Sequence, residues 1–157
     1  MLQNFLRRYP MKIEKILFPT DFLGGSETAI DYAVDLAKKY NAELHIIHVI
    51  HDVTQASGLY VPHVAVDELF KSLEEEANKQ IQRAYLEKTR GLEKISYRVL
   101  RGIPYEEIIN YAKSEGIDLI VVASHARKGL DRLFFGSTAE KVVKNAECAV
   151  LTVRASE

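Results

Sequence analysis

The sequence predicts an α/β protein of three layers, in which a five-stranded parallel sheet carries helices on both faces. Five short apolar segments alternate along the chain with four segments whose apolar residues recur at helical spacing. Strict alternation with short connections is typical of parallel strands joined by crossover helices. In such sheets a ligand lies beyond the carboxyl ends of the strands, at the point where the strand order reverses.

The first half of the chain predicts two strands, two helices and a long loop. Residues 15–20, KILFPT, are short and apolar, as a buried strand requires, and a helix follows Ser26, a candidate N-cap. Residues 42–50, AELHIIHVI, predict the second strand. Residues 51–63 have no periodicity and predict a loop, and apolar positions from residue 66 to residue 85 predict a long amphipathic helix that Gly91 is well placed to end.

The second half predicts three strands and two helices. Residues 94–102, KISYRVLRG, alternate apolar and polar side chains, which indicates a half-exposed strand near the sheet edge. Pro104 suits the first turn of the next helix and Gly116 its end. Residues 118–124, DLIVVAS, predict a central strand covered on both faces. The last helix follows Gly136-Ser137, and residues 148–154, CAVLTVR, predict the final strand.

The composition indicates one globular domain and argues against several classes of protein. The chain has 157 residues, of which 47% are hydrophobic and 27% are charged. A net charge of -1 argues against a dedicated nucleic-acid binder. No apolar run approaches the roughly 18 residues that span a bilayer, and residues 1–10 lack the apolar region of a secretory signal. We therefore expect a cytoplasmic protein, with residues 1–10 as an N-terminal extension and residues 11–157 as one domain; its single cysteine, Cys148, has no partner for an internal disulfide.

Several sequence blocks together resemble the universal stress protein family. KILFPTDF, LHIIHVI, GIPYEEII, DLIVVASH and GLDRLFFGSTAEKVVKNAECAVLTVR occur in the family's order and spacing between Met11 and Arg154. The resemblance implies a universal stress protein domain with strand order 3-2-1-4-5. It also implies an adenine nucleotide such as ATP as cofactor, with Mg²⁺ accompanying it, and a homodimer. The final strand lies at a sheet edge in this order, so antiparallel pairing with its copy in a second chain would cover that edge.

The glycine loop of the nucleotide-binding members is altered in this chain. The family pattern G-x2-G-x9-G-[S/T] falls on Ala123, Ala126, Gly136 and Ser137, so that the spacing is intact and only the final Gly-Ser pair is kept. Where glycine serves a left-handed conformation, alanine costs roughly 1 kcal/mol or more. Where glycine serves a close approach, a methyl group narrows the slot, and a penalty of about 1.4 kcal/mol weakens affinity roughly tenfold.

The resemblance assigns a set of residues to the nucleotide site, of which Asp21 accepts from the base and Val49 contributes its backbone. The residues assigned to the site are Pro19, Thr20, Asp21, Val49, Val122, Ala123, His125, Ala126, Arg127, Gly136, Ser137 and Thr138. The start of the helix at Gly136 attracts phosphate through free N–H groups and the helix dipole.

Other roles remain open for several of these residues. Asp21 also suits a turn or helix start, Ser137 an ordinary N-cap, and His125 a solvated or backbone-bonded position. Arg127 suits a basic surface loop as well as a triphosphate contact. No Ser-His-Asp arrangement is evident, so no catalytic residue is assigned. His45 and His48 should face opposite sides of their strand, which makes them a poor metal pair.

Three functions therefore remain. The first is a nucleotide-binding stress-response or signalling protein that acts on an unidentified protein partner and binds neither nucleic acid nor membrane. The second is a nucleotide-free dimeric interaction module in which the two alanines close the pocket. The third is a slow ATPase or self-phosphorylating enzyme; Walker-type, Rossmann and kinase motifs are all missing.

Overall fold

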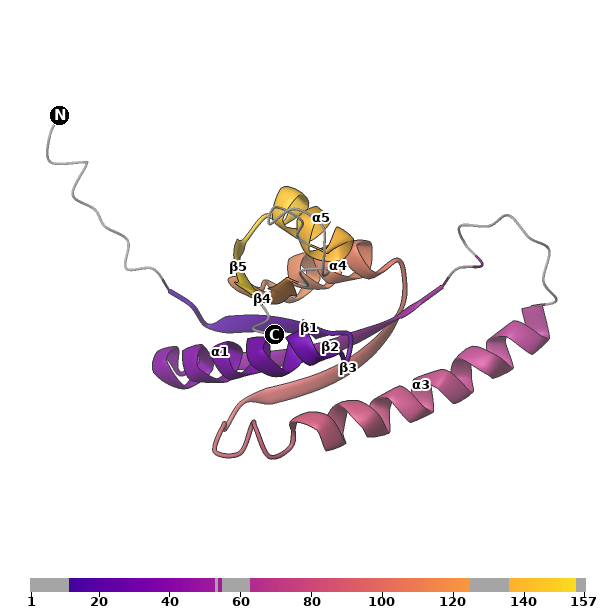
Figure 1. Ribbon diagram of the computed structural model, residues 1–157, viewed down its shortest axis with the longest axis horizontal. Helices are drawn as coiled ribbons and strands as arrows, with labels where there is room; N and C mark the ends of the chain where they lie inside the picture. The colour runs from indigo at the N-terminus through magenta and orange to yellow at the C-terminus, as the bar shows by residue number, and fades with distance from the viewer. Residues whose placement is uncertain (1–11, 53, 55–62, 125–135, 155–157) are drawn as a thin grey trace, which may run out of the picture.

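The computed structural model describes residues 12–52, 54, 63–124 and 136–154; for residues 63–65 it describes the backbone alone. The described chain forms one parallel sheet of five strands in the order β3-β2-β1-β4-β5 (Figure 1). This confirms the predicted architecture and strand order. The strands are β1 (Lys15–Thr20), β2 (Glu43–His51), β3 (Ile95–Gly102), β4 (Leu119–Ser124) and β5 (Ala149–Arg154), and the helices are α1 (Gly24–Tyr40), α3 (His63–Tyr85), α4 (Pro104–Glu115) and α5 (Ser137–Asn145).

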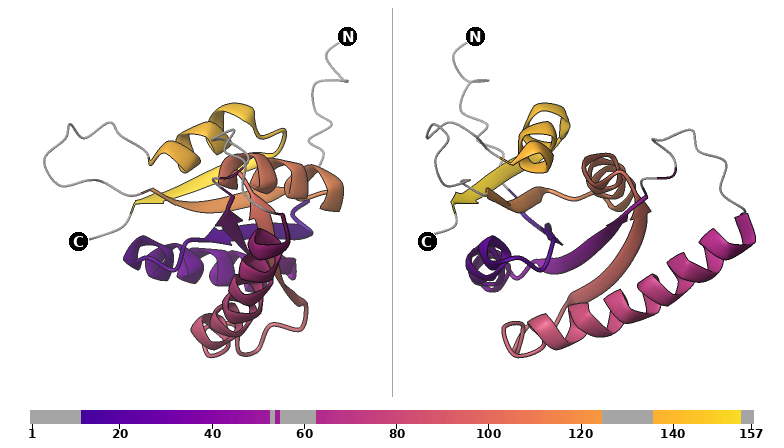
Figure 2. Two further views of the ribbon diagram at one scale, coloured as in Figure 1. Left: turned by 90° about the vertical axis from the view of Figure 1, so that its right-hand side faces the viewer. Right: turned by 45° about the vertical axis from the view of Figure 1, so that its right-hand side comes forward.

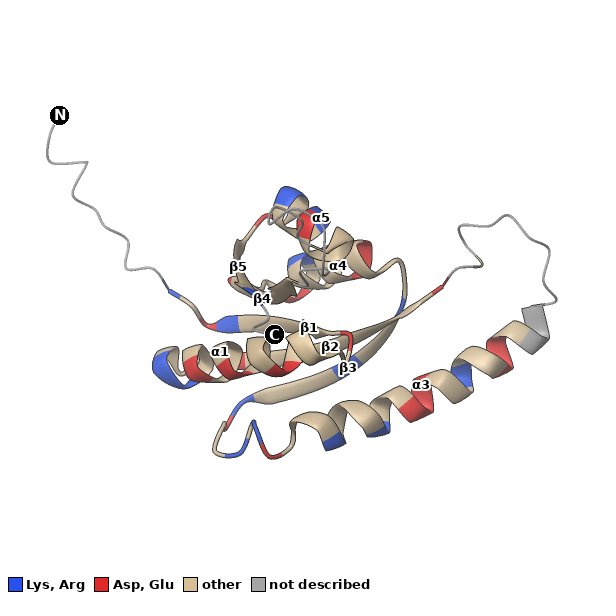
Figure 3. Ribbon diagram, viewed as in Figure 1, with Lys and Arg blue, Asp and Glu red and all other residues tan. Residues whose placement is uncertain are grey.

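The helices cover both faces of the sheet. Figure 2 shows α1 and α3 on one face and α4 and α5 on the other. The amino-terminal half of α3 extends past the sheet (Figures 1 and 2). Figure 3 shows acidic residues along α1 with basic residues at its carboxyl end, and residues of both charges along α3, as expected for solvated helix faces. None of the described helices combines the length and the apolar character needed to cross a membrane.

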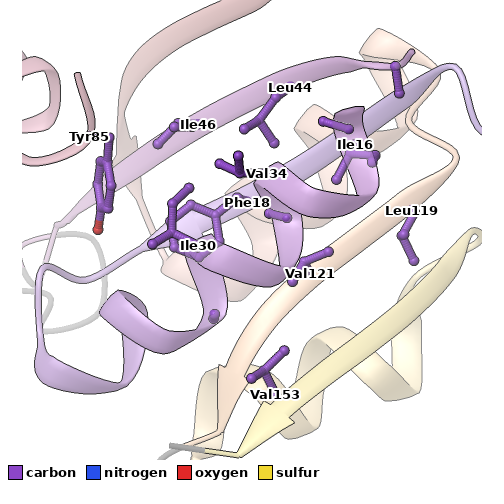
Figure 4. Packing of buried hydrophobic residues seen from close by; sticks show 14 of the residues in the cluster. Ile16, Phe18, Ile30, Val34, Leu44, Ile46, Tyr85, Leu119, Val121 and Val153 are labelled. Atoms are coloured by element: carbon purple, nitrogen blue, oxygen red, sulfur yellow. The ribbon is translucent and has the colours of Figure 1, made fainter. Parts of the chain in front are cut away.

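Each face of the sheet has its own apolar cluster. Phe18, Ile30 and Val121 belong to the cluster under α1 and α3 (Figure 4), and Leu17, Ile120 and Val142 belong to the cluster under α4 and α5. All six residues of β4 are buried, which confirms its prediction as a central strand. Burying a side chain of this size contributes about 1.5–3 kcal/mol, so alternate residues of the central strands hold both helical layers.

Helix ends follow the sequence only in part. Gly116 ends α4 in the left-handed conformation with φ 65°, and Pro104 lies in the first turn, both as predicted. The N-cap of α1 is Leu23 rather than Ser26, which is buried inside the helix. Helix α3 ends at Tyr85, before Gly91, and Gly91 instead takes a φ of 86° in the turn that follows.

Candidate functional site

The strand order reverses between β1 and β4. β1 pairs with β2 on one side and with β4 on the other, so the chain leaves the ends of β1 and β4 in opposite directions across the sheet. Helix α5 is the crossover from β4 to β5, and therefore it begins at the same carboxyl edge (Figure 2). Eight of the residues that the family resemblance assigned to the site lie at this edge: Pro19, Thr20, Asp21, Val122, Ala123, Gly136, Ser137 and Thr138.

The turn after β1 is held by side-chain hydrogen bonds. The Asp21 Oδ1 oxygen accepts from the Leu23 backbone N–H at 2.9 Å and from the Ser26 hydroxyl at 2.8 Å. The Thr20 Oγ1 oxygen accepts from the Phe22 N–H at 3.0 Å. Asp21 thus has the turn role that the sequence left open, and its bond to Ser26 explains why that serine lies inside α1 instead of capping it.

Phe22 occupies the left-handed region with a φ of 61°. A side chain other than glycine pays roughly 1–2 kcal/mol for this conformation. Neighbouring contacts must offset that cost, and the ring of Phe22 lies against the ring of His48 with a centroid distance of 4.4 Å. The Nδ1 nitrogen of His48 lies 2.8 Å from the Thr20 carbonyl oxygen. Sequence reasoning missed His48, because its position opposite Thr20 becomes visible only in the register of the folded sheet.

Helix α3 also contacts this turn. The Tyr85 hydroxyl and the Thr20 hydroxyl share a short hydrogen bond, and the Tyr85 ring packs edge-on against Phe18 at 5.6 Å. Burial raises the pKa of the Tyr85 phenol above its ordinary value, so the neutral hydroxyl is the form that bonds Thr20. Sequence reasoning placed Tyr85 only on an apolar helix face.

The end of β4 differs from the expectation for a glycine position. Ala123 pairs with Val153 in the β4–β5 ladder, and within the described chain only Phe22 and Asn41 have positive φ among residues other than glycine. Ala123 is 8% exposed and belongs to the apolar cluster under α1 and α3. Alanine at this position therefore incurs no left-handed strain, and its methyl group packs in the core. Val122 points to the opposite cluster and is equally buried.

Helix α5 begins without a side-chain cap. Gly136 occupies the N-cap position, so the cap residue offers no side-chain hydrogen bond. Ser137 is the first helical residue instead of the cap. A Cβ atom added to Gly136 would meet no described atom within 4 Å. Glu140 in the first turn pairs with Lys144 at 2.7 Å, and this pairing lowers the pKa of Glu140 and offsets its negative charge. Among the described residues, no atom covers the amino end of α5 at Gly136.

A second polar cluster lies at the carboxyl ends of β2 and β3. Asp52 is fully buried, and its carboxylate accepts from Arg101 Nε at 2.7 Å and from the Thr54 hydroxyl at 2.5 Å. The hydroxyl of Thr54 and then the guanidinium of Arg101 lower the pKa of Asp52. The guanidinium also lies 3.6 Å from the centroid of the Phe70 ring and 3.4 Å from Asp67, so Arg101 fastens the projecting half of α3 to the sheet.

The remaining assigned residues divide into two groups. Val49 is half-buried in β2 and packs against the cluster under α4, as its backbone role allows. His125, Ala126 and Arg127 lie outside the described residues.

The side chains of His45 and His48 face opposite sides of β2, since His45 bonds Tyr111 on α4. In the described ranges no three His, Cys, Asp or Glu residues gather as a metal site would require.

Comparisons with known proteins agree with this geometry. A model of the universal stress protein family matches residues 12–154. Universal stress protein MJ0531 of Methanocaldococcus jannaschii is 35% identical over 156 residues, which cover 98% of this chain and 89% of that protein. The solved structure of MJ0577 from the same organism has a TM-score of 0.78 at 29% identity and covers 93% of this chain and 99% of its own. The structure of an Archaeoglobus fulgidus universal stress protein in complex with dAMP has a TM-score of 0.56 at 17% identity, covering 90% and 98%, and shares the fold.

Proposed function

The chain belongs to the universal stress protein family, and from that premise we propose that it binds an adenine nucleotide at the carboxyl edge between β1 and β4 as a stress-response or signalling protein. One observation carries the proposal: the ordered turn after β1 and the uncapped start of α5 lie at the same edge, on either side of the strand-order reversal. The complex of a structural neighbour with dAMP supports an adenine nucleotide as the ligand class.

The described residues suit the two ends of such a ligand. Asp21 and the backbone of Val49 lie on the β1–β2 side and would meet the base. The first N–H groups of α5, from Ser137 onward, would meet the phosphates, because they carry the positive end of the helix dipole and the glycine at the N-cap offers them no side chain. Mg²⁺ would accompany the phosphates. The Ala123 methyl group packs in the core, which supports an accessible site rather than a closed one.

Calorimetry with ATP, ADP, AMP and cyclic AMP tests the proposal. We expect saturable heat and a higher melting temperature with at least one of these ligands, since a ligand at one hundred times its Kd stabilises the folded state by about 2.7 kcal/mol. Absence of both signals at millimolar ligand would contradict nucleotide binding and leave the closed interaction module as the better function.

A matched pair of glycine variants separates ligand contacts from folding. Gly136→Ala adds a methyl group that meets no described atom, and so does Gly24→Ala at the start of α1. The melting temperature of each variant is compared with that of the parent protein before the affinities are compared. We expect Gly136→Ala to weaken nucleotide binding about tenfold, equivalent to about 1.4 kcal/mol, and Gly24→Ala to leave it unchanged. Equal binding by both variants would remove the start of α5 from the site.

We also propose that the protein is a homodimer joined through β5. β5 pairs only with β4 in the described sheet, so its other edge presents unpaired backbone groups. Val150, Leu151 and Thr152 at its centre are each half-buried in the single chain. Sedimentation velocity should give a dimer, and Thr152→Glu should shift it toward monomer through like-charge repulsion across the pair. A monomeric parent protein would refute this arrangement.

A further inference from the structure

His48 contacts the turn after β1 at two points. It is the register partner of Thr20 across the β1–β2 pair. Its Nδ1 nitrogen lies 2.8 Å from the Thr20 carbonyl oxygen, and its ring lies 4.4 Å from the ring of Phe22, tilted by 35°.

The chemistry of the first contact fixes the tautomer of His48. A carbonyl oxygen only accepts hydrogen bonds, so Nδ1 must carry the hydrogen and donate it. The neutral imidazole then keeps its lone pair on Nε2. A substitution that retains the ring but lacks a donor therefore removes one contact and preserves the other.

The two contacts flank Asp21. The carbonyl group of Thr20 belongs to the peptide unit before Asp21, and Phe22, with its left-handed φ of 61°, follows it. His48 thus constrains the backbone on both sides of Asp21. The Asp21 carboxylate completes the turn by accepting from Leu23 and Ser26.

We propose that His48 is a positioning residue: it orients the turn that carries Asp21, and through that turn it sets the preference of the site for adenine. The imidazole touches no ligand in this proposal. The effect on the turn stands by itself, whereas the effect on base preference rests on the proposed nucleotide function.

The test compares three variants by two measurements. His48→Phe keeps a ring beside Phe22 without a donor, His48→Asn keeps an N–H donor without the ring, and His51→Phe changes an exposed histidine of the same strand as the control. The first measurement is amide hydrogen exchange of Phe22 and Leu23 by NMR. The second is calorimetric affinity for ATP and for GTP, because adenine presents an amino donor to a carboxylate where guanine presents a carbonyl acceptor.

For His48→Phe we expect both amides to exchange about tenfold faster and ATP to bind about tenfold more weakly, while GTP affinity changes less than twofold. His48→Asn should recover most of the amide protection and of the ATP preference, and His51→Phe should match the parent protein in all measurements.

Each other result counts against a stated part of the inference. Unchanged exchange in a folded His48→Phe variant overturns the positioning role. Equal losses for ATP and GTP assign His48 to general stability and overturn its role in base preference. If the parent protein binds none of ATP, ADP, AMP, cyclic AMP and GTP, the proposed function and the base preference fail together, and the exchange rates still decide the effect on the turn. If His48→Phe does not fold, His48→Asn is compared with His48→Ala, and equal exchange in those two overturns the role of the donor.

Discussion

Replacing Ala123 by glycine would restore the family's residue at that position, and the structure predicts that it destabilises the fold without improving nucleotide binding. Ala123 is 8% exposed and packs within the cluster under α1 and α3. Its backbone continues the β4–β5 ladder opposite Val153 without a positive φ. Glycine therefore relieves no strain there and only removes a buried methyl group.

The magnitude follows from two contributions. Removing the buried methyl group costs about 0.8 kcal/mol, and glycine within a strand costs a further 0.5–1 kcal/mol or so in backbone entropy. The sum is about 1.5 kcal/mol, which lowers the melting temperature of a domain of this size by roughly 3–6 °C. ATP affinity should change less than twofold, because the methyl group lies in the core rather than in the site.

Urea denaturation and calorimetry on the same samples measure the two effects. Ala123→Ser is a suitable companion, since it keeps an atom at the methyl position and adds a hydroxyl to an apolar cluster. A gain of tenfold or more in ATP affinity for Ala123→Gly would refute the reasoning, because it would mean that the methyl group obstructs the ligand. An unchanged unfolding midpoint would refute its placement in the core.

Three further predictions concern groups around the sheet. Burial lowers the pKa of His45, so the unfolded chain binds a proton at this side chain more readily than the folded chain does. The free energy of unfolding should therefore be full above about pH 6.5 and fall as the pH drops below that value. Urea midpoints of His45→Gln should lose this pH dependence. Tyr85→Phe removes the hydroxyl that bonds Thr20 and should lower the free energy of unfolding by about 0.5–1.5 kcal/mol in urea titrations, whereas no change would mean that the bond is dispensable. The hydroxyl of Thr54 and then Arg101 lower the pKa of Asp52, so the parent protein should lose stability as the pH falls through the acid range below the ordinary value of 3.8. Urea midpoints should show Arg101→Gln less stable at neutral pH and partly less sensitive to acid, and parallel pH profiles would contradict this pairing.

The elements that sequence predicts best are those whose pattern is set by burial. β1 has the predicted bounds, and β4 is buried along its whole length because both faces are covered. The alternating pattern of residues 94–102 also correctly indicates an edge strand. In each case the side chains report on the burial of the strand, which is complete in the sheet interior and partial at its edge.

Elements that depend on distant contacts are less accessible to sequence reasoning. Ser26 has the residue type of an N-cap, but its hydroxyl donates to the Asp21 carboxylate, and α1 begins before it, at Gly24. Gly91 suits a helix end, yet α3 stops at Tyr85. His48 gives no local signal at all, because its role depends on the Thr20 carbonyl group of the neighbouring strand. Pairs that join separate elements become visible only once the register is known.

The same distinction separates the two alanines of the altered glycine loop. Ala123 lies within β4, where the strand conformation suits any side chain and the core receives the methyl group. The family pattern places Ala126 two residues beyond the end of that strand, outside the described residues. Because Ala123 carries no left-handed strain, the two substitutions do not both contribute the cost of a left-handed alanine, which is roughly 1–2 kcal/mol for each position. At about 1.4 kcal/mol for each factor of ten, the two substitutions then reduce affinity by roughly one order of magnitude and not by two. The proposed nucleotide function is therefore compatible with a sequence that keeps only the last glycine of the pattern.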